Sequence, residues 1–109
     1  MLSYQVESFG RPLARVLRET PAPQGTEVLL QVGSCGVCHS DLHLQDGFFD
    51  LGGGNKIDMT RPMSPPRTLG HEIAGTVAAL GAQAAALGGL RVGDRRIVYP
   101  WIGCGSCST

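Results

Sequence analysis

Glycine and proline recur along the whole chain and limit how long any helix or strand can be. There are 16 glycines and 7 prolines among 109 residues, with no internal repeat. Both residues destabilise the interior of a regular element, so short strands joined by turns are favoured over a helical bundle. The sequence therefore predicts a mainly β fold.

Residue patterning indicates several short strands and one short helix. Apolar and polar residues alternate, or β-branched residues cluster, in the segments 3–9, 13–19, 27–33, 72–80 and 97–99. A helix is expected through Leu42–Gln45, capped by His39 or Ser40, with Asp41 in a first turn that suits a carboxylate. About five or six strands with one helix predict a small antiparallel barrel or sandwich.

Asp46–Leu69 is predicted to be a long irregular loop, because glycine and proline interrupt it throughout. Loops of about two dozen residues are uncommon in compact domains and are often lids or binding loops. Phe48, Phe49 and Met63 either line a pocket there or only hold the loop against the rest of the protein. Farther along, the alanine-rich segment Gly81–Gly89 is expected to be a turn with weak helical character.

Composition favours one folded domain over residues 1–109. The chain is 42% hydrophobic, and its nine basic residues balance nine acidic ones. A zero net charge does not indicate binding to nucleic acid or to an anionic membrane surface, both of which favour an excess of positive charge. No run of residues approaches the roughly 20 apolar residues of a membrane span. The N-terminus lacks the basic and apolar regions of a secretory signal, so a cytoplasmic location with reduced cysteines is expected.

The stretch from Cys35 to His43 carries an unusual density of metal ligands and proton carriers. It reads Cys-Gly-Val-Cys-His-Ser-Asp-Leu-His, and two similar groups follow at 70–72 (Gly-His-Glu) and 103–107 (Cys-Gly-Ser-Cys after a glycine). Zinc takes thiolate, imidazole and carboxylate ligands, and a catalytic zinc uses three protein ligands with one open position. Cys38 and His71 are the leading ligand pair.

Neighbouring residues could support that pair. Asp41 can hold the second nitrogen of a ligating imidazole, although helix capping alone would explain it. Ser40 and His43 lie three apart on one helix face, where a hydroxyl and an imidazole can pass a proton from a metal-bound alcohol to solvent. A surface serine and a surface histidine explain the same spacing, so both interpretations stay open.

Two other interpretations of the four cysteines are weaker. Cys35 and Cys38 could be a redox pair, but such pairs usually follow a strand-helix pattern, whereas here they lead into His39. Alternatively, Cys35, Cys38, Cys104 and Cys107 could form one structural zinc site. The separation between the two pairs far exceeds the roughly 15–20 residues that are usual in zinc ribbons.

Together these motifs resemble the N-terminal catalytic domain of zinc-dependent alcohol dehydrogenases, in the medium-chain dehydrogenase/reductase family. The resemblance runs from 21–29 through Cys35–His43, 70–72 and 92–95 to 103–107, in the family's order. It implies a GroES-like, partly open β-barrel. It also implies hydride transfer from an alcohol to NAD or NADP, giving an aldehyde or ketone. The catalytic zinc of alcohol dehydrogenase is known to have two cysteine ligands and one histidine ligand.

The resemblance assigns metal ligation to five residues, namely Cys38, His71, Glu72, Cys104 and Cys107. The first two would bind catalytic zinc, Glu72 would be an alternate ligand, and the two later cysteines would begin a structural zinc site. Asp41 would orient the ligating histidine. Ser40 would hydrogen-bond the substrate hydroxyl, His43 would complete the proton relay, and His39 would lie near the cofactor pyrophosphate.

Parts of the family's pattern fall outside residues 1–109, namely the third catalytic ligand, the last two structural cysteines and the Rossmann cofactor domain with its glycine motif. Cys35 matches no ligand position and is expected to be a small packed residue. The sequence therefore suggests a fragment or truncated product, and whether these residues alone form an enzyme stays open. Small-molecule alcohols or aldehydes are the expected substrates, and a homo-oligomer is expected. The alternative is a zinc-binding, self-associating module without dehydrogenase activity of its own.

Overall fold

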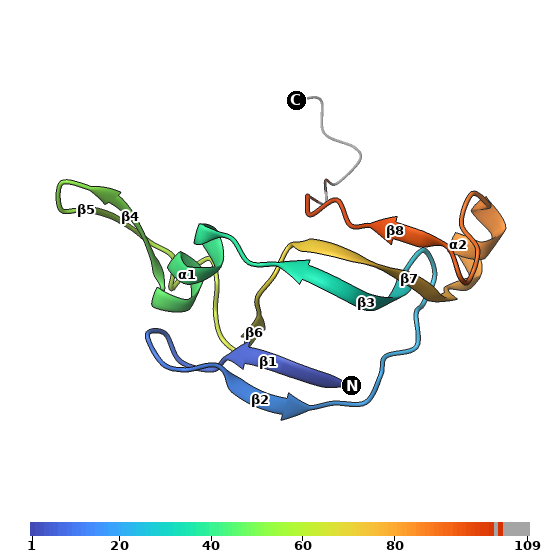
Figure 1. Ribbon diagram of the computed structural model, residues 1–109, viewed down its shortest axis with the longest axis horizontal. Helices are drawn as coiled ribbons and strands as arrows, with labels where there is room; N and C mark the ends of the chain where they lie inside the picture. Colours follow the sequence, from blue (N-terminus) through green and yellow to red (C-terminus); the bar gives the residue numbers. More distant parts are fainter. Residues whose placement is uncertain (102, 104–109) are drawn as a thin grey trace. The chain divides into compact units, whose positions relative to one another are not determined.

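The chain is mainly β-structure, which confirms the predicted fold class. The computed structural model describes residues 1–101 and 103. Its strands are β1 (Leu2–Val6), β2 (Ala14–Leu17), β3 (Val28–Gly36), β4 (Phe48–Gly52), β5 (Asn55–Asp58), β6 (Arg67–Thr68), β7 (Glu72–Leu80) and β8 (Arg95–Ile97), and its helices are α1 (His39–Asp46) and α2 (Ala82–Leu87) (Figure 1). Two compact units divide the chain, one made of Met1–Pro21 with Val37–Gly70 and one made of Ala22–Gly36 with the chain from His71. In the described residues, no helix is long and apolar enough to cross a membrane.

The first unit contains a three-stranded sheet in the order β2-β1-β6. Val6 ends β1 and is fully buried. Gln5 is also buried, and its side-chain amide donates to the hydroxyls of Ser3 and Thr68 and accepts a hydrogen bond from Arg18. A buried amide is tolerated only when it is hydrogen-bonded, so these partners fix Gln5 in the sheet.

The same unit contains a β-hairpin where an irregular loop was predicted, so that prediction was wrong. β4 and β5 pair antiparallel, and the turn between them contains Gly53 and Gly54, both with positive φ. Tight hairpin turns require such backbone angles, so the glycines form the turn and do not break the ladder. At the end of β5, the hydroxyl and backbone N–H of Thr60 donate to Asp58 and hold the pKa of that carboxyl below its usual value.

The second unit contains a three-stranded antiparallel sheet in the order β3-β7-β8. β-Branched and leucine residues give β3 its strand character, and β7 matches its predicted bounds. Val77, in the middle of β7, is 1% exposed. Its backbone exchanges hydrogen bonds with Gly93 and Asp94, so the turn before β8 is attached directly to the buried part of the sheet.

Three further details differ from the prediction. α2 is a full helix in the segment expected to be a turn with weak helical character, because the alanines between Gly81 and Gly88 favour a helix. β8 begins at Arg95, where it pairs with Thr76, and not at Ile97 as predicted. The described strands form three separate sheets. They therefore do not close into the partly open barrel that was expected.

Replacing Gly75 with alanine should strongly weaken the β3–β7 pair. A Cβ at this position would lie 2.5 Å from the backbone oxygen of Gln31 in the neighbouring strand, which cannot move without breaking the ladder. Overpacking of this kind costs about 1–3 kcal/mol. Gly33→Ala is the matched control, since its nearest neighbour would be 3.6 Å away. Urea denaturation measures both, and equal losses of stability would contradict the prediction.

Candidate metal centre

The two predicted catalytic zinc ligands lie next to the end of one strand ladder. The last pair between β3 and β7 joins Gly36 and Glu72. Cys38 follows Gly36 by two positions, and His71 directly precedes Glu72. In an antiparallel pair, the chains leave the last pair side by side. Residues far apart in the sequence therefore leave the sheet from the same end.

Cys38 is the N-cap of α1, which corrects the predicted cap at His39 or Ser40. Its sulfur accepts a hydrogen bond from the backbone of Asp41, and its own N–H donates to the Asp41 carboxylate at 3.0 Å. This reciprocal pattern is a capping box, with a thiol in the position usually held by a hydroxyl. The cap fixes the sulfur at the helix N-terminus, where the helix dipole favours negative charge.

Asp41 connects this cap to the residue that precedes His71. Its side chain is 5% exposed. One carboxylate oxygen accepts the N–H of Cys38, and the other accepts the N–H of Gly70 at 3.1 Å. Gly70 has a φ of 100°, a backbone angle that favours glycine. The buried carboxylate therefore holds both the cysteine and the peptide that leads into the histidine.

Cys38, Asp41 and His71 form a group with the chemistry of a metal site. Each offers one ligand atom, and these atoms all lie within 4.8 Å of one another. Asp41 is buried, whereas the cysteine and the histidine are partly exposed. Within residues 1–101 and 103, this is the one group of at least three such residues close enough to hold an ion.

The other predicted ligands lie outside this group. Glu72 is exposed at the start of β7, and its carboxylate occupies the space beside Gly36, where an added Cβ would come within 2.1 Å of an oxygen. Cys35 is an exposed free cysteine on β3, whereas it was expected to be packed. Cys104 and Cys107 lie outside the described residues.

The three predicted relay and cofactor residues lie on α1 or at its start. Ser40 and His43 share a helix face by spacing, but among the described residues no hydrogen bond joins them. The His43 ring instead lies close to two other rings, each tilted relative to it. Its centroid is 4.3 Å from that of His39 and 4.8 Å from that of Phe49 on β4. The stack holds the His43 ring against the hairpin.

Two contacts of the site had no clear signal in the sequence. The N–H of Gly70 is a backbone group, and only the glycine before His71 hinted at a special backbone angle there. Phe49 was considered as a pocket residue or as a packing residue, and its contact with His43 supports the packing role. Two short runs that contain aromatic or β-branched residues, Phe48–Gly52 and Asn55–Asp58, are separated by Gly53 and Gly54, and this was the signal that could have revealed the hairpin.

Comparison with known proteins identifies the family. Residues 24–109 match the family described as the alcohol dehydrogenase GroES-like domain. The chain belongs to this family, in agreement with the resemblance stated above. The family accounts for the mainly β fold and for the order of the cysteine and histidine motifs along the chain.

Individual relatives are much longer than this chain. An NAD-dependent alcohol dehydrogenase from Saccharolobus solfataricus is 37% identical over 107 residues, which are 98% of this chain and 29% of that protein. The crystal structure of AibC superposes with a TM-score of 0.79 at 32% identity, over 99% of this chain and 27% of that one.

A dehydrogenase from Sinorhizobium meliloti 1021, described as zinc-binding and bound to NADP, has a TM-score of 0.73 at 32% identity, over 98% of this chain and 27% of that one. This chain thus spans less than a third of the length of these relatives.

Proposed function

We propose that this chain is the zinc-binding catalytic domain, residues 1–109, of an alcohol dehydrogenase that uses NAD or NADP. The observation that carries the proposal is the group of Cys38, Asp41 and His71 beside the end of the β3–β7 ladder. Family membership supports the reaction class. The cofactors named for two relatives, NAD for one and NADP for the other, support a nicotinamide cofactor.

The residues present fit a zinc ion. Thiolate and imidazole are ligands that zinc prefers, and Cys38 and His71 supply one of each. Asp41 is better suited to orienting than to ligation, because both of its oxygens already accept backbone N–H groups. Glu72 is adjacent to His71 in the sequence and is available as a further ligand. A second, structural zinc at Cys104 and Cys107 rests on the family resemblance.

The proposed chemistry uses the side chains of α1. Bound zinc would supply a Lewis acid for the alcohol oxygen. Ser40 would accept the hydroxyl proton of the substrate, and His43 would carry that proton to solvent. Contact of the His43 ring with His39 and Phe49 supports this role, since a ring held in one orientation loses little freedom when it accepts a proton.

The proposed substrate class and cofactor contact rest on the family, and the proposed self-association rests on exposed apolar side chains. Dehydrogenase relatives support a small-molecule substrate, and an alcohol or aldehyde is the proposed class. His39 would lie near the cofactor pyrophosphate. Self-association is favoured by large apolar side chains left exposed, such as Trp101 at 77%. The cytoplasmic location stays a prediction.

A chimera tests the proposed function. Substituting this chain for the matching 107 residues of the Saccharolobus solfataricus enzyme should give a protein that reduces NAD in the presence of an alcohol. Removing metal with a chelator should abolish this activity, and added zinc should restore it. Ser40→Ala should lower kcat by about 10²-fold or more, because general-base assistance is worth that much. A folded, zinc-loaded chimera without activity would contradict the proposal.

A further inference from the structure

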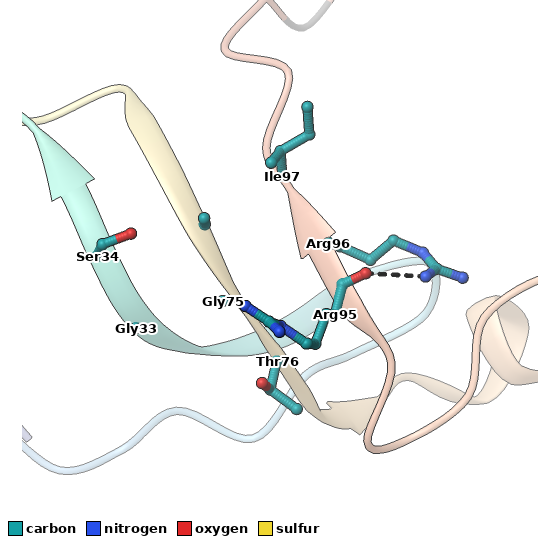
Figure 2. A pocket seen from close by; sticks show the side chains of 8 residues that line it. Gly33, Ser34, Gly75, Thr76, Arg95, Arg96 and Ile97 are labelled. Carbon is teal, nitrogen blue, oxygen red and sulfur yellow. Dashed lines mark hydrogen bonds between the residues drawn. The ribbon is translucent and has the colours of Figure 1, made fainter.

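A hollow of about 610 Å³ lies on the sheet of the second unit, and no role predicted above uses it. Its lining residues come from β3, β7 and β8, and they are Gly33, Ser34, Ala74, Gly75, Thr76, Arg95, Arg96 and Ile97. None of these residues is acidic. Small side chains dominate β3 and β7 here, whereas the long side chains are on β8 (Figure 2).

Strand register puts a cation, two hydroxyls and an apolar side chain on one face of this sheet. Ala74 pairs with Ser34 on one side and with Ile97 on the other, and Thr76 pairs with Arg95. Ala74 and Thr76 are two apart in β7, so they and their partners face the same way. The register shift between Val32 and Ser34 is a bulge, a feature that commonly re-aims side chains beside binding sites.

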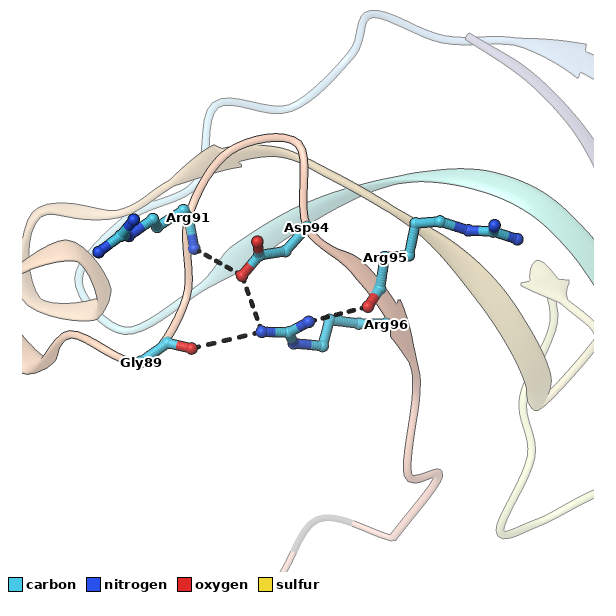
Figure 3. A network of polar contacts seen from close by, with 5 residues as sticks. All are labelled: Gly89, Arg91, Asp94, Arg95 and Arg96. Carbon is cyan, nitrogen blue, oxygen red and sulfur yellow. Dashed lines mark hydrogen bonds and ion pairs between the residues drawn. The ribbon is translucent and has the colours of Figure 1, made fainter.

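The two arginines that line the hollow differ in their hydrogen bonds and ion pairs. Arg96 donates to the Asp94 carboxylate at 2.7 Å and to the backbone oxygens of Arg95 and Gly89 (Figure 3). Its charge is therefore paired. The Arg95 guanidinium makes no hydrogen bond or ion pair with any residue that the structure describes. Its side chain extends back toward β7, opposite to Arg96 (Figure 2).

An arginine with no partner among the described residues, next to the threonine paired with it, is suited to an oxyanion, because the planar N–H groups of the guanidinium match the two oxygens of a carboxylate. In the neighbouring row of the register, Ala74 and Ile97 are apolar and Ile97 is 84% exposed, whereas Ser34 pairs with Ala74 on the side away from β8. We propose that this hollow binds a small aliphatic carboxylate. The carboxylate would lie on Arg95 and Thr76, and the hydrocarbon part would lie on Ala74 and Ile97.

Binding of hexanoate, acetate and inorganic phosphate to the 109-residue chain tests the proposal by NMR titration. Hexanoate should bind saturably, with a dissociation constant on the order of millimolar. The backbone amides of Ser34, Thr76 and Ile97 should shift. Acetate should bind more weakly because it lacks the hydrocarbon part. Phosphate binding tighter than hexanoate would overturn the assignment to an organic acid.

Variants separate the charge from the apolar contact. Arg95→Gln should weaken hexanoate binding by about tenfold, the usual worth of one charge-assisted hydrogen bond. The control is Arg15→Gln, which removes an exposed strand arginine that does not line the hollow. Ile97→Ser should weaken hexanoate but leave acetate unchanged. Equal losses from the two arginine variants, or the absence of saturable binding by the folded chain, would overturn the proposal.

Discussion

Replacing Cys38 or His71 with alanine is expected to lower the affinity of this chain for Zn²⁺ by about a hundredfold or more. Each variant removes one of the proposed ligands, whereas loss of a group that only supports a ligand already costs about 10–100-fold. The measurement is competition with a chromophoric chelator at neutral pH. Cys104 and Cys107 should first be changed to serine, so that only one kind of zinc site is titrated.

The chain provides its own matched control for this prediction. Cys35→Ala removes a thiol three positions before Cys38, but Cys35 is an exposed free cysteine on β3 and not part of the metal group. Its zinc affinity should stay within about twofold of the parent chain, because no ligand is lost. Similar losses of zinc affinity from Cys35→Ala and Cys38→Ala would contradict the assignment of Cys38, without Cys35, as a ligand.

Glu72→Gln tests whether Glu72 is a further zinc ligand beside Cys38 and His71. If the carboxylate supplies a further ligand, zinc affinity should fall by about 10-fold or more. The Glu72 side chain lies beside Gly36, at the last pair of the β3–β7 ladder. Glu72 also directly follows His71, so its carboxylate is near enough in the chain to bind the same metal. An unchanged affinity would leave Cys38 and His71 as the ligands from these residues, and the proposed role of Glu72 would be wrong.

The residues of the metal centre were predictable because their chemistry is concentrated in the sequence. Cysteine, histidine and aspartate within a few positions of each other are a local signal that needs no knowledge of the fold. The approach of His71 to the same site depends on the pairing of β3 with β7, and both strands were predicted from their apolar composition. The pairing of β3 with β7 itself was not predicted, because strand patterning does not say which strands become neighbours.

The errors had a different physical origin. Gly52, Gly53 and Gly54 were interpreted as breakers of regular structure, although Gly53 and Gly54, with positive φ, form the hairpin turn and Gly52 ends β4. The cap of α1 was assigned to a histidine or a serine because thiols are rarely considered as caps. Contacts made by backbone groups, such as the hydrogen bond from the N–H of Gly70 to Asp41, do not depend on a particular side chain and so cannot be recognised in a sequence. Such contacts could be found only in the structure.

Asp41→Ala is expected to lower the free energy of unfolding by about 2–4 kcal/mol, even when a chelator keeps zinc away. The substitution removes a buried carboxylate that accepts the N–H groups of Cys38 and Gly70. Each donor left unsatisfied costs about 1–3 kcal/mol, and loss of a helix cap costs about 0.5–2 kcal/mol. Urea denaturation followed by circular dichroism measures the change.

Two companion variants define what the carboxylate does. Asp46→Ala removes an exposed aspartate at the other end of α1 and should change stability by no more than about 0.5 kcal/mol. Asp41→Asn keeps the shape and one acceptor oxygen, so its loss should be intermediate. If Asp41→Ala were as mild as the Asp46 control, the carboxylate would not hold the two chain segments together. The orientation of His71 through Gly70 would then lose its structural basis.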